Sequence, residues 1–201
     1  MRASRILTAL FILLAACSTA SAAPKIGEPA PDFTLTGSDG KAYALGAFKG
    51  KYVILEWTNH ECPFVKKHYG SGNMQAQQKE LIGKGAVWLT IVSSAPGKQG
   101  HVDAAAATEL TKNRSAAPTA VLLDPSGEVG RKYDAKTTPH MFIVAPDGKL
   151  IYMGGIDSIP SADTEDIAKA TPYVQVALGE AMAGKPVSNP STRPYGCSVK
   201  Y

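Results

Sequence analysis

The residue best suited to chemistry in this chain is Cys62, which lies in the turn Asn59-His60-Glu61-Cys62-Pro63-Phe64-Val65. The apolar run Tyr52–Trp57 before this turn predicts a buried strand, and Pro63 favours the first turn of a helix. A cysteine at the start of a helix faces unpaired backbone N–H groups and the positive end of the helix dipole, which both favour the thiolate. Since the thiolate is the nucleophile, the sequence predicts a reactive sulfur at Cys62.

Two neighbours of Cys62 carry charges that would act on its pKa. His60, when protonated, would lower the pKa of the thiol, whereas the carboxylate of Glu61 would raise it. Helix N-termini and nearby cations bring a cysteine pKa from ~8.5 into a range of roughly 3.5–7.5. The alternative interpretation is a buried, unreactive cysteine that packs as a small apolar side chain.

The beginning of the chain predicts an export signal. Two positive charges in Met1-Arg2-Ala3-Ser4-Arg5 precede the apolar run Ile6–Ala16, which is too short to span a bilayer as a helix. The small residues Ala20-Ser21-Ala22 fit a signal peptidase site, which assigns residues 1–22 to the signal. Residues 23–201 are then long enough for a single domain with its own core.

A second cleavage site competes with the first. Leu14-Ala15-Ala16-Cys17 resembles the lipobox of bacterial lipoproteins, and in that case the signal ends at Ala16 and Cys17 becomes a lipidated membrane anchor. We expect no other membrane contact. Both routes predict a periplasmic protein that keeps the thiols Cys62 and Cys197 in an oxidising compartment where disulfides persist.

The charge balance argues against a nucleic-acid partner. The formal net charge is +4, and it becomes +2 when the signal with its two arginines is removed. A nucleic-acid-binding domain usually concentrates a larger positive charge on one face. We therefore interpret the scattered lysines as solvated surface.

The hydrophobic pattern predicts an α/β protein with a mixed central β-sheet flanked by helices. Strands are expected at Asp32–Thr36, Tyr52–Trp57, Ala86–Val92, Thr119–Leu123, Met141–Val144 and Lys149–Gly154. Helices are expected from Pro63 to about Lys84 with a break at Gly70-Ser71-Gly72, from Val102 to Asn113, in a short segment through Tyr133, and from about Thr164 to Met182.

Three segments of this pattern resemble the redoxin, or peroxiredoxin-like, branch of the thioredoxin superfamily, of the AhpC/TSA type. Gly27–Leu35 resembles the redoxin opening, and Cys62-Pro63-Phe64-Val65 resembles the single-cysteine motif of peroxiredoxin-like members. The segment Thr138–Val144, with Asp147-Gly148-Lys149 after it, resembles the strand that begins with a cis proline. The resemblance implies a thioredoxin-like fold with helices on both faces of the sheet and no cofactor.

The resemblance also assigns roles to residues near Cys62. Thr138 and Pro139 would hold the substrate backbone beside the attacking sulfur, with Pro139 in the cis form and His140 close to Cys62. Asn59 and His60 would help to position the substrate. An ordinary trans proline at the start of an edge strand is the alternative for Pro139.

This sequence departs from the related enzymes at two places. Val65 stands where a reductase has its second cysteine, and Asn59 stands where a peroxiredoxin has the threonine or serine that positions a peroxide, with Thr58 one residue earlier. Arg114 and Arg131 are candidates for the arginine that peroxiredoxins place near the thiolate. The substrate class therefore stays open between a peroxide and a protein disulfide.

Cys197 lies far from Cys62 in the sequence, and the preceding Gly196 gives the tail freedom to fold back. Our preferred hypothesis is that Cys62 attacks the substrate and Cys197 resolves the intermediate, after which an external, thioredoxin-like dithiol reduces the disulfide. The alternatives are an unpaired tail thiol and a permanent disulfide, which in the chain-entropy model stabilises the fold by roughly 4–5 kcal/mol.

A non-catalytic function is the second hypothesis. A redoxin fold with a structural Cys62–Cys197 disulfide would serve as a binding module for a metal ion or a protein. The candidate metal ligands are His60, Cys62 and His140, with His68 as a further histidine. This metal signal is weak, because no second cysteine lies close to Cys62 in the sequence.

Overall fold

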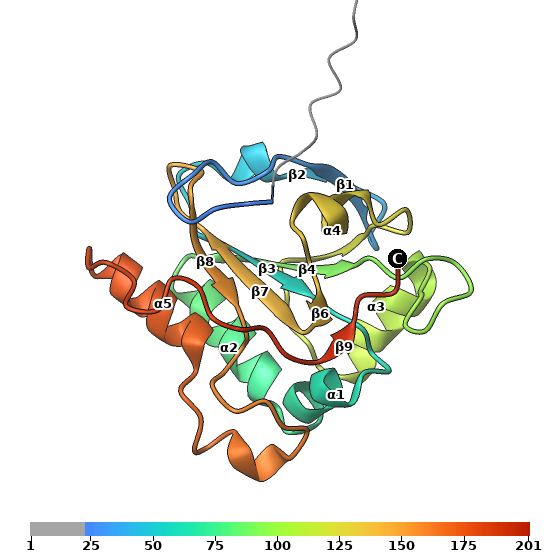
Figure 1. The fold of residues 1–201 in the computed structure, drawn as a ribbon. Coiled ribbons are helices and arrows are strands. Elements are labelled where there is room, and N and C mark those ends of the chain that lie inside the picture. Colours follow the sequence, from blue (N-terminus) through green and yellow to red (C-terminus); the bar gives the residue numbers. More distant parts are fainter. Residues whose placement is uncertain (1–22) are drawn as a thin grey trace, which may run out of the picture.

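The computed structural model describes residues 23–201, so the predicted export signal and Cys17 lie outside the described residues. A sheet of seven strands has the order β2-β1-β5-β4-β3-β7-β8, and its layers are visible in Figure 1. The strands are β1 (Thr34–Gly37), β2 (Ala42–Ala44), β3 (Val53–Trp57), β4 (Val87–Val92), β5 (Ala120–Leu123), β7 (His140–Val144) and β8 (Leu150–Gly154). A small separate sheet pairs β6 (Thr137–Thr138) with β9 (Cys197–Ser198).

The sheet is mixed, as the sequence pattern predicts. Strand β3 runs parallel to β4 and antiparallel to β7, and every residue of the three strands is buried. Continuous apolar runs are typical of strands that are covered on both faces. The buried centre of the sheet therefore carries the strand that leads to Cys62.

The helices are α1 (Pro63–Gly70), α2 (Asn73–Gly83), α3 (Ala104–Asn113), α4 (Glu128–Lys132) and α5 (Tyr173–Met182), with short 3₁₀ turns at Leu45–Phe48 and Thr164–Asp166. The expected break between α1 and α2 occurs at Gly72, whose φ of 78° is unfavourable for residues with a side chain. No helix within the described residues is long and apolar enough to cross a membrane.

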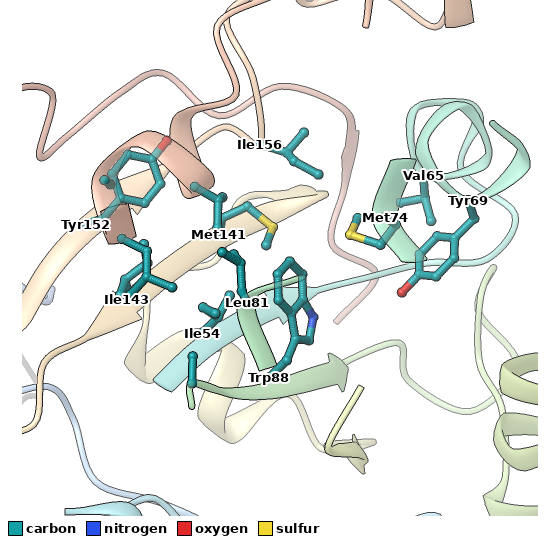
Figure 2. Close-up of a cluster of buried hydrophobic side chains, with 14 of the residues drawn as sticks. Ile54, Val65, Tyr69, Met74, Leu81, Trp88, Met141, Ile143, Tyr152 and Ile156 are labelled. Carbon is teal, nitrogen blue, oxygen red and sulfur yellow. The ribbon is translucent and has the colours of Figure 1, made fainter. Parts of the chain in front are cut away.

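Two large hydrophobic clusters pack on opposite faces of the sheet. The first joins α1, α2 and α5 to the face that includes Ile54, Trp88 and Met141, and Cys62 belongs to it. Figure 2 shows side chains of this cluster, among them Ile54 of β3 and its partner Trp88 of β4. The second joins α4 and the N-terminal segment to the face that includes Leu55 and Trp57. Side chains alternate between the faces along each strand, so neighbouring residues belong to different clusters.

The prediction of one long terminal helix from about Thr164 to Met182 is wrong. The structure has a 3₁₀ turn at Thr164–Asp166, and α5 begins only at Tyr173. Pro172 precedes this first helical residue. A proline inside a helix removes one backbone donor and clashes with the preceding turn, so a continuous helix could not include Pro172.

Candidate active site

The turn after β3 is held by hydrogen bonds from one side chain. Asn59 is almost completely buried; its Oδ1 accepts the Glu61 N–H at 2.9 Å and its Nδ2 donates to the Gln99 carbonyl at 3.3 Å. The Asn59 carbonyl accepts the Cys62 N–H at 3.1 Å. Asn59 therefore shapes the backbone that presents Cys62, and its polar atoms are engaged with the protein itself.

A second loop packs against this turn at Gly100. The Gly100 N–H donates to Glu61 Oε2 at 2.6 Å. Gly100 has a φ of 82°, and a Cβ at this position would collide with the side-chain amide of Asn59. The close approach requires glycine, and it ties the Glu61 carboxylate to a backbone donor.

Cys62 lies at the N-terminus of α1, as predicted. It occupies the capping position, Pro63 is the first helical residue, and the Cys62 carbonyl accepts the Lys66 N–H at 2.9 Å. The side chain of Cys62 has no exposed surface. The sulfur is thus placed at the positive end of a helix and shielded from solvent.

The proline predicted to be cis is cis. The Thr138–Pro139 bond has this form, and it brings the Thr138 carbonyl to 3.1 Å from Cys62 Sγ, where it accepts the thiol proton. Strand β6 ends at Thr138, so its backbone runs directly past the sulfur. Thr138 therefore lies beside Cys62; contact of Thr138 and Pro139 with a substrate stays a prediction.

The C-terminal tail, which follows the end of α5 at Met182, brings Cys197 next to Thr138. In the antiparallel pairing of β6 with β9, Cys197 is opposite Thr138 and Ser198 is opposite Thr137. The Thr138 hydroxyl donates to the Cys197 carbonyl at 3.5 Å. In Figure 1 the tail passes across the molecule and β9 lies alongside β6. Both cysteines are free thiols, and that of Cys197 is only partly buried.

The two thiols have opposite pKa shifts. Burial is the strongest influence on Cys62 and opposes ionisation, but hydrogen bonds from the Cys197 thiol, the Val65 N–H and the Cys197 N–H together lower its pKa. Burial, the hydrogen bond to Cys62 and the nearby charge of Cys62 raise the pKa of Cys197 to about 11. The Thr138 carbonyl favours the protonated Cys62 thiol, and its hydrogen bond is lost when Cys62 ionises.

The expectation that a protonated His60 lowers the pKa of Cys62 is not confirmed. Burial lowers the pKa of His60, which favours its neutral form, and the groups that shift the pKa of Cys62 do not include it. His60 instead lines a small cavity of about 20 Å³ together with Arg114. The helix terminus and the tail, rather than an imidazolium, favour the thiolate.

The expectation that His140 lies near Cys62 is wrong. The His140 ring lies 4.4 Å from that of Phe142, a member of the cluster on the opposite face of the sheet from Cys62. Its Nδ1 accepts the Lys136 N–H at 3.3 Å. Side chains alternate along β7, so Met141 packs on the Cys62 face and His140 projects to the other.

Neither candidate arginine lies beside the thiol. The Arg114 guanidinium stacks on the Tyr69 ring at 4.1 Å, and Arg131 stacks on the Tyr201 ring at 4.6 Å. Within residues 23–201 there is also no group of three or more His, Cys, Asp or Glu side chains that could hold a metal ion. The separation of His140 from Cys62 removes one of the ligands on which the metal hypothesis depended.

One buried acid was missed by the sequence analysis. Glu56 in β3 is fully buried, and its carboxylate accepts hydrogen bonds from four side chains: Tyr69, Gln78, Trp88 and Thr90. The available signal was an acidic residue inside an otherwise apolar strand. The donors link α1, α2 and β4 to β3. This network holds in place the strand that leads to Cys62.

The arrangement is suited to two-step thiol chemistry. The Cys62 thiolate is favoured by hydrogen-bond donors, and Cys197 lies opposite Thr138, whose carbonyl contacts Cys62 Sγ. A sulfur attached to Cys62 after a first attack would lie beside a second thiol from the same chain. The intermediate could then be resolved as an intramolecular disulfide without a second subunit.

Comparison with known proteins identifies the family of this chain. The model of the AhpC/TSA family matches residues 26–153. The thiol-disulfide oxidoreductase ResA of Bacillus thuringiensis subsp. konkukian (strain 97-27) is 27% identical over 163 residues, which cover 75% of this chain and 88% of that protein.

Solved structures share the fold. An uncharacterized conserved protein of Geobacillus kaustophilus has a TM-score of 0.74 and 25% identity, covering 88% of this chain and 92% of that one. The pneumococcal exposed lipoprotein thioredoxin of Streptococcus pneumoniae strain TIGR4 has a TM-score of 0.50 and 28% identity, covering 69% and 96%. The family match includes Cys62 and Pro139, whereas Cys197 lies outside it. The extent of the match shows that the chain belongs to the AhpC/TSA family, in the redoxin branch of the thioredoxin superfamily.

Proposed function

We propose that this protein is a thiol-based oxidoreductase in which Cys62 attacks the substrate and Cys197 resolves the intermediate. The observation that carries the proposal is the register of β9 on β6, which sets Cys197 opposite Thr138, the residue whose carbonyl contacts Cys62 Sγ. The opposite pKa shifts support the same order of events, because the sulfur with the lower pKa is the better attacking group at neutral pH.

Disulfide exchange is the reaction that we favour. The Cys62 thiolate attacks one sulfur of a protein disulfide, forms a mixed disulfide and releases the other sulfur as a thiolate. Cys197, after losing its proton, attacks Cys62 Sγ and releases the reduced substrate, which leaves a Cys62–Cys197 disulfide. An external, thioredoxin-like dithiol then returns both cysteines to thiols. The name of the Bacillus relative, a thiol-disulfide oxidoreductase, supports this choice.

Peroxide reduction is the second candidate. The thiolate would attack one peroxide oxygen, forming a sulfenic acid and releasing water or an alcohol once the leaving oxygen is protonated. Cys197 would then displace water to form the same disulfide. Cys62 is completely buried, and a peroxide is small enough to reach a buried sulfur more easily than a protein disulfide can. Two observations argue against peroxide reduction. The side-chain amide of Asn59 is already hydrogen-bonded to the backbone, and Arg114 stacks on Tyr69, so neither is free to position a peroxide.

We also propose that the protein acts outside the cytoplasm. Residues 1–22 have the composition of an export signal, and Cys17 is the candidate lipid anchor if the earlier site is cleaved. The pneumococcal relative is named as an exposed lipoprotein. An exported site would meet the protein disulfides and the dedicated dithiol reductants on which the proposed cycle depends.

The proposal is tested by counting thiols with mass spectrometry in residues 23–201. Reduced protein receives one equivalent of either hydrogen peroxide or an oxidised model peptide, with wild type and Cys197→Ser side by side. We expect wild type to form a Cys62–Cys197 disulfide that a thioredoxin-like reductant opens. Cys197→Ser should accumulate a mixed disulfide with the peptide, or a sulfenic acid with peroxide.

The relative rates of the two oxidants decide the substrate class. Faster reaction with the peptide supports disulfide exchange, and faster reaction with peroxide supports the second candidate. A Cys62–Cys197 bond that is already present and resists mild reductants would contradict both. It would support the non-catalytic binding module with a structural disulfide.

A further inference from the structure

The segment that carries Cys197 is fixed to the protein by two tyrosines, one on each side of the cysteine. Between Tyr195 and Tyr201 the main structured element is β9, which contains only Cys197 and Ser198. A strand of this length has too few hydrogen bonds to hold a thiol in place by itself. Besides β9, the segment is held by the Val199 N–H, which donates to the Lys136 carbonyl at 3.1 Å, and by the contacts of the two tyrosines.

Tyr195 is anchored in a buried polar group next to the Cys62 helix. Its hydroxyl donates to Asp157 Oδ1 at 2.5 Å and lies 3.2 Å from His68 Nε2. Its ring packs edge-on against Phe64, two residues after Cys62, with 5.7 Å between the ring centroids. Phe64 and His68 both belong to α1. Tyr195 thus ties the tail directly to the helix that begins at the attacking cysteine.

The protonation states of this group are consistent with its hydrogen bonds. Asn73 Nδ2 donates to His68 Nδ1 at 2.8 Å, which leaves the proton of the neutral ring on Nε2, toward Tyr195. Burial lowers the pKa of His68 to about 4, so the ring is neutral at pH 7. Burial raises the pKa of Tyr195, which keeps its hydroxyl a donor to Asp157.

Asp157 depends on Tyr195 for a close hydrogen bond from a side chain. The Asp157 carboxylate is nearly buried, and its Oδ2 has no hydrogen-bond partner; the nearest cation is Lys67 Nζ at 3.6 Å, and the neutral His68 ring lies 3.7 Å away. Its Oδ1 also accepts the Ile159 N–H at 3.0 Å. A buried carboxylate that loses a charge-assisted hydrogen bond destabilises the state in which it stays buried. Loss of the Tyr195–Asp157 hydrogen bond should therefore destabilise the position of the tail seen in this structure, in which Asp157 stays buried.

Tyr201 anchors the other side of the segment. Its hydroxyl donates to the Ala135 carbonyl at 2.7 Å, and its ring stacks under Arg131. Gly127 and Gly130 make room for the ring, since a Cβ on either glycine would collide with it. The Lys200 carbonyl also accepts the Ala95 N–H at 2.8 Å. This anchor lies on α4, apart from the Tyr195 anchor on α1.

We propose that Tyr195 and Tyr201 are positioning residues that hold Cys197 beside Cys62 for the resolving step. This inference rests on the proposed function. The anchors act on the equilibrium between a closed tail, in which the thiols meet, and an open tail, in which Cys197 is in solvent. They raise the effective concentration of Cys197 at Cys62 and thereby favour the intramolecular disulfide. Since the closed tail covers Cys62, the same anchors limit access of a bulky substrate.

The first test removes one hydroxyl. Tyr195→Phe keeps the ring contact with Phe64 and loses the hydrogen bond to Asp157. Loss of a hydrogen bond to a charged group is expected to lower the equilibrium constant for disulfide formation by up to about tenfold, the full factor applying to a reduced protein whose tail is mainly open. That upper bound corresponds to a reduction potential about 30 mV less negative. The measurement is the disulfide fraction in glutathione redox buffers, read by mass spectrometry.

A second variant tests the other anchor. Tyr201→Ala empties the space between Gly127 and Gly130 and should lower the same equilibrium constant. The matched control is Tyr43→Phe, which also removes a tyrosine–aspartate hydrogen bond, from Tyr43 to Asp39 at 2.9 Å, on a strand at the edge of the main sheet. It should leave the disulfide equilibrium at the wild-type value, because β2 does not hold the tail.

A readout that is independent of redox activity separates this inference from the proposed function. In a Cys62→Ser background, the alkylation rate of Cys197 measures how often the tail opens. Both anchor variants should increase that rate, and in the intact thiol pair they should slow disulfide closure without slowing the first attack on a model disulfide. Wild-type alkylation rates and equilibrium constants in both variants would overturn the inference. Failure of the proposed function would instead appear in the wild type, as the absence of a reducible Cys62–Cys197 disulfide.

Discussion

The two cysteines are held by very different parts of the molecule. Cys62 lies where a fully buried strand enters a helix, with Glu56 and Asn59 fixing the backbone before it. Cys197 lies in a two-residue strand on a tail outside the family match, between two tyrosine contacts. Cys62, the proposed attacking thiol, is therefore part of the core, whereas Cys197 is part of an attached segment.

This difference matches the needs of the two steps. An attacking thiolate benefits from a fixed geometry and a lowered pKa, which the helix terminus and the surrounding donors supply. The resolving thiol must lie close to the first sulfur and yet move aside when a substrate enters. A raised pKa keeps Cys197 protonated at neutral pH, and a protonated thiol next to Cys62 favours the Cys62 thiolate.

The largest expected effect comes from removing the core cysteine. Cys62→Ser should slow reaction with peroxide or a model disulfide by about a hundredfold or more, because at pH 7 each unit of higher pKa reduces the thiolate fraction about tenfold. Burial raises the pKa of Cys197, and this effect remains when Cys62 and its charge are removed. The measurement is substrate consumption under single-turnover conditions. Cys197→Ser is the control and should keep the wild-type rate of the first attack. Equal rates of substrate consumption in the two variants would mean that Cys62 is not the preferred attacking thiol.

The next effect concerns the stability of the core region. Glu56→Gln keeps the size of the side chain but loses the charge that accepts hydrogen bonds from Tyr69, Trp88 and Thr90. We expect the free energy of unfolding to fall by about 3 kcal/mol, measured by urea denaturation. Glu80→Gln is the control, since its ion pair with Lys84 is exposed and should contribute less than about 1 kcal/mol. Equal losses would contradict a special role for the buried acid.

A smaller effect is expected in the attached segment. Gly196 has a φ of 134°, and a Cβ there would collide with the Thr138 carbonyl. Gly196→Ala should therefore disturb the pairing of β9 with β6 and slow disulfide closure about tenfold, as expected for a loss near 1.4 kcal/mol. Gly184→Ala is a control, because it also replaces a glycine of positive φ but meets no neighbouring atom. Closure is followed by quenched alkylation, and a wild-type rate in Gly196→Ala would show that the pairing is dispensable.

The smallest effect is a change in the ionisation of Cys62. The Cys197 thiol is the strongest of the hydrogen-bond donors that lower the pKa of Cys62. Serine at position 197 keeps a donor and alanine does not, so the pKa of Cys62 should be higher in Cys197→Ala than in Cys197→Ser. Thiolate forms as the pH rises through the pKa, and the first-step rate of the alanine variant should therefore rise at a higher pH. Coincident pH profiles would mean that Cys197 does not help Cys62 to ionise.

Local patterns predicted most of the core region. The apolar run before Cys62, the proline after it and the glycine break between α1 and α2 each reflect a constraint that acts within a few residues. The error at the last helix has the same local character, because Pro172 was a visible reason to begin α5 later. The role of Glu56 was harder to predict, since its four donors come from elements that are distant in the sequence.

The sequence by itself determined that Cys62 begins a helix, that Pro139 follows a threonine in a redoxin-like segment, and that a glycine precedes Cys197. Only the tertiary structure decided that His140 faces away from Cys62, that Asn59 holds the turn, and that Cys197 pairs with Thr138. The physical reason is the distance along the chain over which each constraint acts. Helix starts and turns follow from neighbouring residues, whereas the face of a strand and the position of a tail follow from packing between segments far apart in the chain.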